Sequence, residues 1–86
     1  MTSGPTTVRW FGAARAAAGV AEERYDAATL GALLREAVSA HGRPLADVLR
    51  ACSFLVDGRA VGERPHDQVP LSEVGLVDVL PPFAGG

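Results

Sequence analysis

The chain has 86 residues, of which 48% are hydrophobic, and a formal net charge of −2 at pH 7. These values predict one small folded domain and argue against nucleic acid or an anionic membrane as the main partner. Because no run could span a bilayer, the N-terminus lacks a signal-peptide pattern and the single cysteine fits a reducing compartment, we expect a cytoplasmic protein.

The beginning of the chain predicts a leader and a strand. Residues 1–5 are polar and contain Gly and Pro, so we expect a flexible leader. In a strand over residues 6–11, Val8 and Trp10 share the core face, whereas Phe11 lies on the outer face beside an arginine. A lone outward aromatic is a candidate partner contact. The alternative is a Phe11 ring tucked under the following loop.

The next segment predicts a helical turn and a second strand. Residues 12–19 contain an alanine-rich run that Gly19 closes. Arg15 lies in this run and is either only solvated or a contact for a partner. Residues 20–25 predict a short charged strand that pairs with the first one. Its outward Glu and Arg side chains would discourage pairing with other chains at a sheet edge.

The main helix is predicted over residues 30–41. Thr29 is a suitable N-cap, and Gly42 is typical of the residue after a helix end. The apolar stripe comprises Leu30, Leu33, Leu34, Ala37, Val38 and His41. Gly31 costs about 1 kcal/mol relative to Ala in a helix, so we expect it to allow close packing. His41 in the last turn is expected to favour the helix dipole rather than to take part in chemistry.

The second half of the chain predicts a short helix and a hairpin. Pro44 fits the first position of a helix over residues 44–51. Cys52 follows it and is expected to be a buried residue rather than a catalytic or metal-binding one. Asp57-Gly58, between the apolar runs 53–56 and 59–61, is the strongest hairpin signal in the chain.

A polar loop leads to the last strand. Residues 62–70 contain two prolines and an isolated His66, for which we expect no metal site. A short bridge over residues 69–71 and a turn over residues 72–75 precede the strand at 76–80. This strand is the most apolar in the chain, so we expect it at the centre of the sheet, parallel to the first strand.

The order of elements predicts an α+β fold, a β-grasp (ubiquitin-like) roll. We expect a mixed sheet of about four to five strands, with one main helix packed across it and a short second helix. The predicted division is a leader at 1–5, the β-grasp domain at 6–82 and an extended C-terminal Gly-Gly arm at 83–86.

The arm is the most distinctive segment of the sequence. Pro81 and Pro82 end the last strand because neither has a backbone N–H for the ladder. Four residues past Pro82 span about 13–14 Å at full extension. The last two residues have no side chain, so the carboxylate of Gly86 can enter a narrow slot in another protein's active site. The alternative is a frayed and dispensable end.

The sequence contains no catalytic constellation with local motif support, no phosphate-binding loop and no zinc spacing. We therefore expect a protein that is not catalytic alone and binds no cofactor or metal. Its distinctive chemical group is the α-carboxylate of Gly86. A carboxylate is a poor electrophile, and another enzyme must activate it, typically by adenylation with ATP and Mg²⁺.

The ending Leu80-Pro81-Pro82-Phe83-Ala84-Gly85-Gly86 and the segment Phe11-Gly12-Ala13-Ala14-Arg15 after the first strand resemble the MoaD/ThiS family of β-grasp sulfur carriers. The resemblance covers about residues 7–86. Pro-Pro-x-Ala-Gly-Gly favours the molybdopterin branch, the small subunits of molybdopterin synthase, over thiamine carriers. Two departures concern the partner surface: Ala16 replaces a frequent acid, and Glu73-Val74-Gly75-Leu76 replaces the usual acidic turn.

The resemblance implies a reaction cycle. An ATP-dependent activating enzyme adenylates Gly86, which Gly85 precedes, and a persulfide donor converts it to a thiocarboxylate. The arm then enters the large subunit of molybdopterin synthase and gives sulfur to cyclic pyranopterin monophosphate, and two large subunits complete a heterotetramer. The implied partner-binding residues are Phe11, Arg15, Ala60, Leu80, Pro81, Pro82, Phe83 and Ala84.

Three other functions remain open. A carrier of the same chemistry could serve thiamine, cysteine or a specialised sulfur metabolite. A ubiquitin-like modifier would join its C-terminus to target lysines. An inert β-grasp interaction module would not need Gly85 and Gly86. All 8 basic residues are arginine, so the chain itself has no lysine side chain to receive an isopeptide bond.

Overall fold

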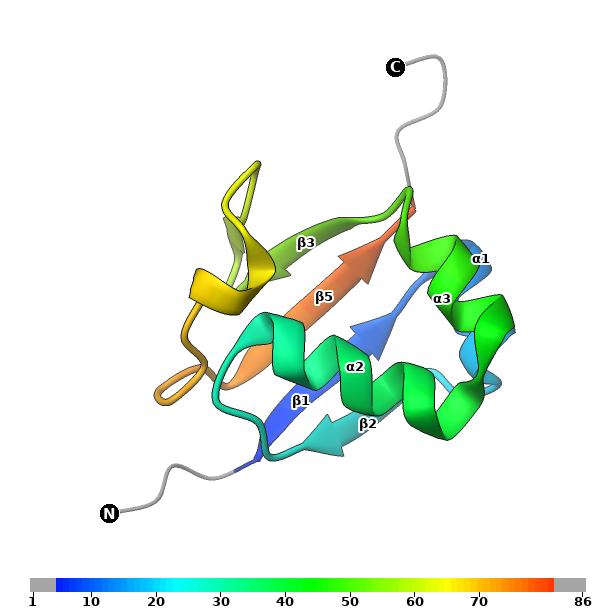
Figure 1. Cartoon of the computed structure of the whole chain (residues 1–86), viewed down its shortest axis with the longest axis horizontal. Coiled ribbons are helices and arrows are strands. Elements are labelled where there is room, and N and C mark those ends of the chain that lie inside the picture. The colour runs from blue at the N-terminus through cyan, green and yellow to red at the C-terminus, as the bar shows by residue number, and fades with distance from the viewer. Residues whose placement is uncertain (1–4, 82–86) are drawn as a thin grey trace.

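A computed structural model describes residues 5–81 of the chain (Figure 1). In this part the chain forms, in order, β1 (Thr6–Trp10), α1 (Gly12–Ala18), β2 (Glu22–Tyr25), α2 (Leu30–His41), α3 (Arg43–Leu49), β3 (Ser53–Val56), β4 (Arg59–Ala60), the 3₁₀ turn η1 (His66–Gln68) and β5 (Leu76–Leu80). The strands form one mixed sheet, and α2 lies across one of its faces (Figure 1).

The strand order in the sheet is β2-β1-β5-β3-β4. β5 pairs parallel with β1 and antiparallel with β3, and the two outer pairs are antiparallel. The expected central position of the last strand and its parallel pairing with the first are both confirmed. A parallel pair needs a long crossover, which here contains all three helices. The α+β β-grasp fold expected from the sequence is therefore the observed one.

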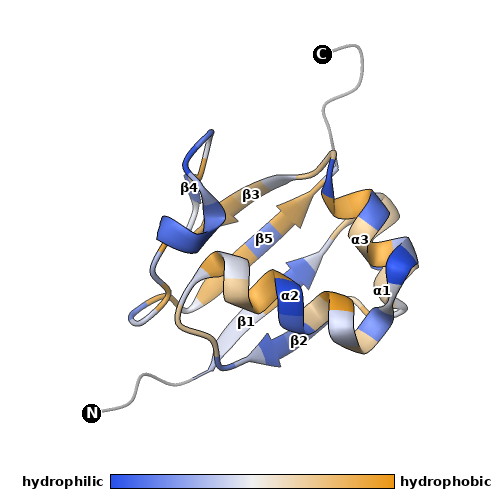
Figure 2. Ribbon diagram, viewed as in Figure 1, coloured by the Kyte–Doolittle hydropathy of each residue, from blue (hydrophilic) through white to orange (hydrophobic). Residues whose placement is uncertain are grey.

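The core lies between the sheet and the helices. Val8 and Trp10 of β1 are buried as predicted, together with Val77 and Val79 of β5. The helices contribute buried residues that include Ala14, Ala18, Leu30, Leu33, Leu34, Ala37 and Leu45. Figure 2 shows β3 and β5 coloured mostly as hydrophobic and the edge strand β2 as hydrophilic. The charged β2 at an edge matches the expectation that its side chains protect that edge.

The ends of the helices follow their capping residues. The Thr29 side chain accepts a hydrogen bond from the backbone N–H of Ala32 at 3.1 Å, which starts α2 where the sequence predicted it. Gly42 ends α2 with φ of +89°, and Gly19 ends α1 with φ of +80°. Both angles lie in the region that favours glycine, so Gly19 ends α1 before β2 and Gly42 separates α2 from α3.

The hairpin between β3 and β4 turns at Asp57-Gly58, as predicted. Both residues have positive φ, +48° and +84°, which is the combination of a type I′ turn. Asp57 Oδ1 also accepts backbone hydrogen bonds from Gly75 at 3.1 Å and Leu76 at 2.9 Å. The turn therefore fixes the beginning of β5.

Several boundaries differ from the sequence-based expectations. The first short helix has two turns, and Phe11 is its N-cap rather than the end of β1. α3 begins one residue before Pro44 and ends two residues earlier than expected. β2 is shorter than residues 20–25, because its ladder with β1 begins only at Glu22, which pairs with Arg9. Val61 lies outside β4, although it is buried.

The long loop before β5 packs on the start of α2. Thr29 forms the expected bridge with Pro70, and the N–H of Leu30 donates to the Val69 carbonyl at 2.9 Å. A Cβ atom at Gly31 would overlap the Asp67 carboxylate and lie 3.1 Å from the Asp67 backbone nitrogen. The prediction that Gly31 allows close packing is therefore confirmed.

Candidate functional site

The base of the C-terminal arm lies beside the N-terminus of α1. β5 ends at Leu80, which is partly exposed, and Pro81 follows as an exposed residue. The Phe11 N–H donates to the Val79 carbonyl at 3.1 Å, and a Cβ on Gly12 would lie 3.2 Å from ring atoms of Pro81. The remaining predicted arm residues, Pro82, Phe83, Ala84, Gly85 and Gly86, lie outside the described residues.

The face of the sheet away from the core carries the predicted docking residues of the strands. Strand alternation and register place Thr7 and Arg9 of β1, Asp78 and Leu80 of β5, Ser53 and Leu55 of β3 and Ala60 of β4 on this face. Between residues 5 and 81, the helices pack on the opposite face. We call this surface the outer face of the sheet.

The predicted contacts Phe11, Arg15, Ala60 and Leu80 fall into two neighbouring groups. Phe11, the N-cap of α1, is 37% exposed, and the N–H of the exposed Arg15 donates to its carbonyl at 3.4 Å. The alternative of a Phe11 ring tucked under the next loop is therefore wrong. Leu80 and Ala60 line one hollow of about 410 Å³ at the β3–β4 edge of the sheet, which Phe54 and His66 of the helix side also line.

An ion pair at the centre of the outer face was not foreseen from the sequence. Arg9 Nε lies 2.7 Å from Asp78 Oδ1, and Nη2 lies 3.2 Å from Oδ2. The hydrogen bond and the charge of Asp78 raise the pKa of Arg9. The Arg9 guanidinium also lies 5.7 Å from the centre of the Phe11 ring. The available signal was an aspartate at an outward position in an otherwise apolar strand.

A hydrogen-bonded cluster joins β1, β2 and α2 around Glu23. Its Oε1 accepts from Trp10 Nε1 at 3.1 Å and from the Tyr25 hydroxyl at 3.0 Å, and it lies 2.7 Å from His41 Nε2. Burial acts to raise the pKa of Glu23, but the hydrogen bonds from His41, Trp10 and Tyr25 outweigh it and lower that pKa. Burial and the neighbouring Glu23 raise the pKa of Tyr25 to about 12. His41 thus lies in the last turn as expected, with its ring paired to β2.

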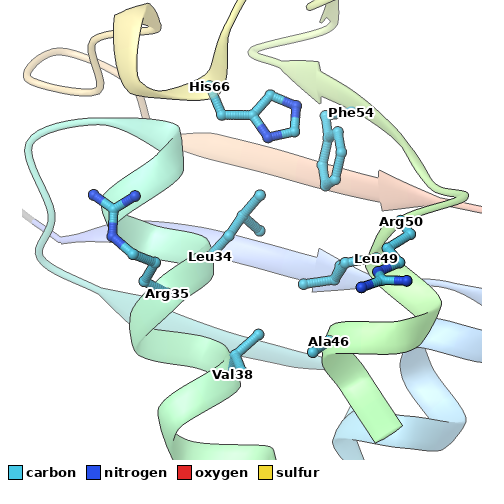
Figure 3. A pocket seen from close by; sticks show the side chains of 8 residues that line it. All are labelled: Leu34, Arg35, Val38, Ala46, Leu49, Arg50, Phe54 and His66. Atoms are coloured by element: carbon cyan, nitrogen blue, oxygen red, sulfur yellow. The ribbon is translucent and has the colours of Figure 1, made fainter. Parts of the chain in front are cut away.

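A second hollow of about 360 Å³ lies on the helix side of the sheet (Figure 3). Figure 3 shows Phe54 and His66 together at one end, and their rings pack edge to face with centres 4.9 Å apart. Arg35 at the rim pairs with Asp67 at 2.9 Å. Other lining residues are Leu34, Val38, Ala46, Leu49 and Arg50. No local pattern in the sequence indicated this hollow, because four separate elements form it.

The structure gives Cys52 a packing role. Its thiol is partly buried and donates to the Val48 carbonyl at 3.3 Å, and burial raises its pKa. A raised pKa favours the thiol over the nucleophilic thiolate.

Among residues 5–81, no three His, Cys, Asp or Glu side chains are grouped closely enough to hold a metal ion. None of the helices between residues 5 and 81 combines the length and the hydrophobicity that a membrane span requires.

Solved structures with this fold include two small archaeal modifier proteins. The solution structure of SAMP1 from Methanosarcina acetivorans has a TM-score of 0.81 and 18% identity, covering 100% of this chain and 99% of that one. The crystal structure of SAMP1 from Haloferax volcanii has a TM-score of 0.71 and 23% identity, covering 96% and 100%. A putative molybdopterin converting factor, subunit 1, from Pyrococcus furiosus has a TM-score of 0.71 and 23% identity, covering 94% and 100%. At these identities the likeness establishes the fold.

The sequence comparison establishes the family. No curated protein sequence matches this chain. The model of the ThiS family matches residues 8–86, which is nearly the whole sequence and includes the terminal Gly-Gly. The chain therefore belongs to the ThiS family, the ThiS/MoaD group of sulfur carriers with the ubiquitin-like β-grasp fold.

Proposed function

We propose that this protein carries sulfur on Gly86 and donates it to cyclic pyranopterin monophosphate in molybdopterin biosynthesis. The observation that carries the proposal is the ThiS family match through Gly86, combined with the Pro-Pro-x-Ala-Gly-Gly ending after β5. The molybdopterin branch is preferred over thiamine carriers because of the two prolines and the alanine in that ending.

The position of β5 supports a carrier. Its central place in the sheet anchors the base of the arm through pairs on both sides, with β1 and with β3. Pro81 is exposed at the end of the strand, and five residues follow it in the sequence. Five residues span about 17 Å at full extension, enough to bring a C-terminal carboxylate into a partner's active site while the body stays outside.

The chemistry requires activation by another enzyme. The Gly86 carboxylate attacks the α-phosphorus of ATP, pyrophosphate leaves, and an acyl adenylate forms in the activating enzyme with Mg²⁺. A persulfide sulfur then attacks the acyl carbon and AMP leaves. A thiol reduces the resulting acyl disulfide to the thiocarboxylate and is itself oxidised to a disulfide. The carrier supplies the acyl group and a surface for docking. The ATP, the Mg²⁺ and the persulfide belong to the partners.

Docking is assigned to the outer face and the base of the arm. Ala60 and Leu80 lie on that face, Phe11 and Pro81 lie at the base of the arm, and Arg15 is exposed in α1. The hollow that Leu80 and Ala60 line adds apolar surface. Large exposed apolar side chains are typical of contact surfaces. Pro82, Phe83, Ala84 and Gly85 would continue the contact along the arm. In the proposed complex, the large subunit of molybdopterin synthase covers this surface.

A ubiquitin-like modifier is the second candidate, because the two SAMP1 structures share the fold. A modifier forms isopeptide bonds between Gly86 and lysines of other proteins. It predicts covalent adducts that disappear when Gly86 is removed. A carrier predicts sulfur on the otherwise free protein.

Reconstitution tests the proposed acceptor. The purified chain is incubated with its host's activating enzyme, ATP, Mg²⁺ and a persulfide donor, and then with the molybdopterin synthase large subunit and cyclic pyranopterin monophosphate. We expect molybdopterin to form in proportion to the thiocarboxylate consumed. A parallel reaction with thiazole synthase is the control. Sulfur transfer only to thiazole synthase would refute the molybdopterin role and retain the carrier chemistry.

A further inference from the structure

Charged and apolar side chains divide the outer face along its middle row. Strand register places Glu22, Arg9, Asp78, Leu55 and Ala60 side by side across the five strands. The row is charged on the β2 side and apolar on the β4 side. Phe11 and Leu80 are the next residues on the same side after Arg9 and Asp78, in the direction of the base of the arm. The Arg9–Asp78 pair therefore borders the apolar part of the proposed docking surface.

Asp78 holds Arg9 in one orientation. The Asp78 side chain is only 10% exposed, whereas the Arg9 side chain above it is 46% exposed. The Arg9 guanidinium is held by two hydrogen bonds to Asp78 along one edge. The Phe11 ring near the central carbon of the guanidinium restricts its position further. The positive group thus faces outward and the negative group lies beneath it. A contact group that is fixed before binding loses little conformational entropy on binding.

The guanidinium retains donors for a partner. A guanidinium has five N–H bonds, and Asp78 uses one on Nε and one on Nη2. Within residues 5–81, the Nη1 end of Arg9 has no hydrogen-bond partner. The Nη1–Nη2 end offers two parallel N–H groups, whose spacing matches the two oxygens of a carboxylate. A wholly apolar partner surface would bury these donors without acceptors, at a substantial desolvation cost.

We propose that Arg9, oriented by Asp78 and Phe11, determines which proteins dock on the outer face, and that its partner places an Asp or Glu carboxylate on the free guanidinium end within an apolar contact. This inference rests on the proposed carrier function. The partner assigned to it is the activating enzyme, because adenylation of Gly86 precedes every acceptor pathway. The carboxylate of that enzyme would fix the register of the carrier and so direct the arm into the adenylation site.

The test compares binding of the full chain and its variants to the host's activating enzyme by calorimetry, at about 50 mM and about 300 mM salt, which change the screening length roughly twofold. The central variant is Arg9→Met with Asp78→Leu, because removing both members of the pair leaves no unpaired charge at the largely buried position 78. Arg9→Lys is a second variant that keeps the positive charge but removes the planar guanidinium and its paired N–H donors. Arg24→Met is the matched control, since Arg24 is an exposed arginine of β2 opposite Thr7 on the same face.

We expect the double variant to keep its melting temperature, to bind at least about tenfold more weakly at low salt, and to lose part of the salt dependence of binding. Arg9→Lys should weaken binding to an intermediate degree, and Arg24→Met should leave it close to wild type. Equal or tighter binding by the double variant would mean that the pair is only structural and would overturn the inference. If the salt dependence of binding is unchanged in the double variant, the group that Arg9 meets is a neutral carbonyl rather than a carboxylate. That result would also overturn the inference.

If the double variant is unfolded, Arg9→Lys alone decides the question, because it retains a cation for Asp78. Failure of the carrier function has a different signature. A wild-type chain that the activating enzyme neither binds nor adenylates would reject the proposed function and this inference together. A wild-type chain and an Arg9 variant that bind and are adenylated equally well would reject the inference alone.

Discussion

His41 Nε2 at the end of α2 lies 2.7 Å from Glu23 Oε1 on the edge strand β2. The same oxygen accepts from the buried Trp10 and from Tyr25. One carboxylate therefore ties the main helix to the two strands at this side of the sheet. The cluster lies away from the proposed docking residues, so its disruption should affect stability and not sulfur transfer.

The first prediction concerns Glu23 and acid stability. Because the folded-state pKa of Glu23 is below its ordinary 4.5, its ionised form stabilises the fold above that pH and the contribution is lost as pH falls through the lowered value. We expect Glu23→Gln to cost about 1 kcal/mol at neutral pH, after allowance for partial exposure, and much less in acid. Urea unfolding, followed by the fluorescence of the single tryptophan, measures the free energy of unfolding at neutral pH and in acid. An equal cost at both pH values would contradict the assignment.

The second prediction concerns the single tyrosine of the chain. Burial and Glu23 raise the pKa of Tyr25 to about 12, so ultraviolet absorbance should show tyrosinate forming near that pH. Stability from the neutral phenol is complete below its ordinary value of 10 and is lost as pH rises through about 12. In Glu23→Gln the pKa of Tyr25 should decrease, because the charge of Glu23 is removed and its hydrogen bond to the hydroxyl is weakened. A wild-type midpoint of 10 would show that the hydroxyl is not in this cluster.

The third prediction concerns the contact of α2 with η1. In an open helix Gly→Ala stabilises by about 1 kcal/mol. At position 31 we expect Gly31→Ala to destabilise by about 1–3 kcal/mol, because the new methyl group overlaps Asp67. Adding Asp67→Ala should restore part of the loss, since the backbone nitrogen remains 3.1 Å away. Asp67→Ala alone is the control, and urea denaturation is the measurement. A stabilised Gly31→Ala protein would disprove the close contact.

The fourth prediction separates the arm from the body. Gly86→Ala should abolish sulfur loading, because a methyl group does not fit a slot shaped for glycine, and it should leave the melting temperature unchanged. Leu34→Asp should do the opposite and unfold the domain by burying a charge in the core. Thiocarboxylate formation with the activating enzyme and thermal unfolding by circular dichroism provide the two readouts. A large loss of melting temperature in Gly86→Ala would contradict the division between arm and body.

The sequence predicted those parts of the fold that local signals determine. Thr29 and Gly42 mark the ends of α2 because capping depends on neighbouring residues, and the apolar run of β5 predicted a central strand. The Phe11 position followed from alternation along β1. Side-chain contacts between distant segments could not be predicted in the same way, because they depend on the exact register of the paired strands. Arg9 and Asp78 are 69 residues apart and meet only through the parallel β1–β5 register.

The same reason limited the prediction of the site. Ala60 and Leu80 were placed at the docking surface by resemblance, and the shared hollow depends on the β3–β5 register that no local pattern contains. His41 was expected to act on the helix dipole, because its partner Glu23 belongs to a different element. The assignments of Pro82, Phe83, Ala84, Gly85 and Gly86 lie outside the described residues and stay predictions.

The most direct test of the carrier proposal is the intact mass of the protein purified from its own host under non-reducing conditions, without hydroxylamine. We predict a species ending at Gly86 that is heavier than the sequence mass by the replacement of one oxygen with sulfur, and that is absent from a strain lacking the activating enzyme. A population that contains only the unmodified carboxylate, or only covalent adducts with other proteins, would contradict the proposal.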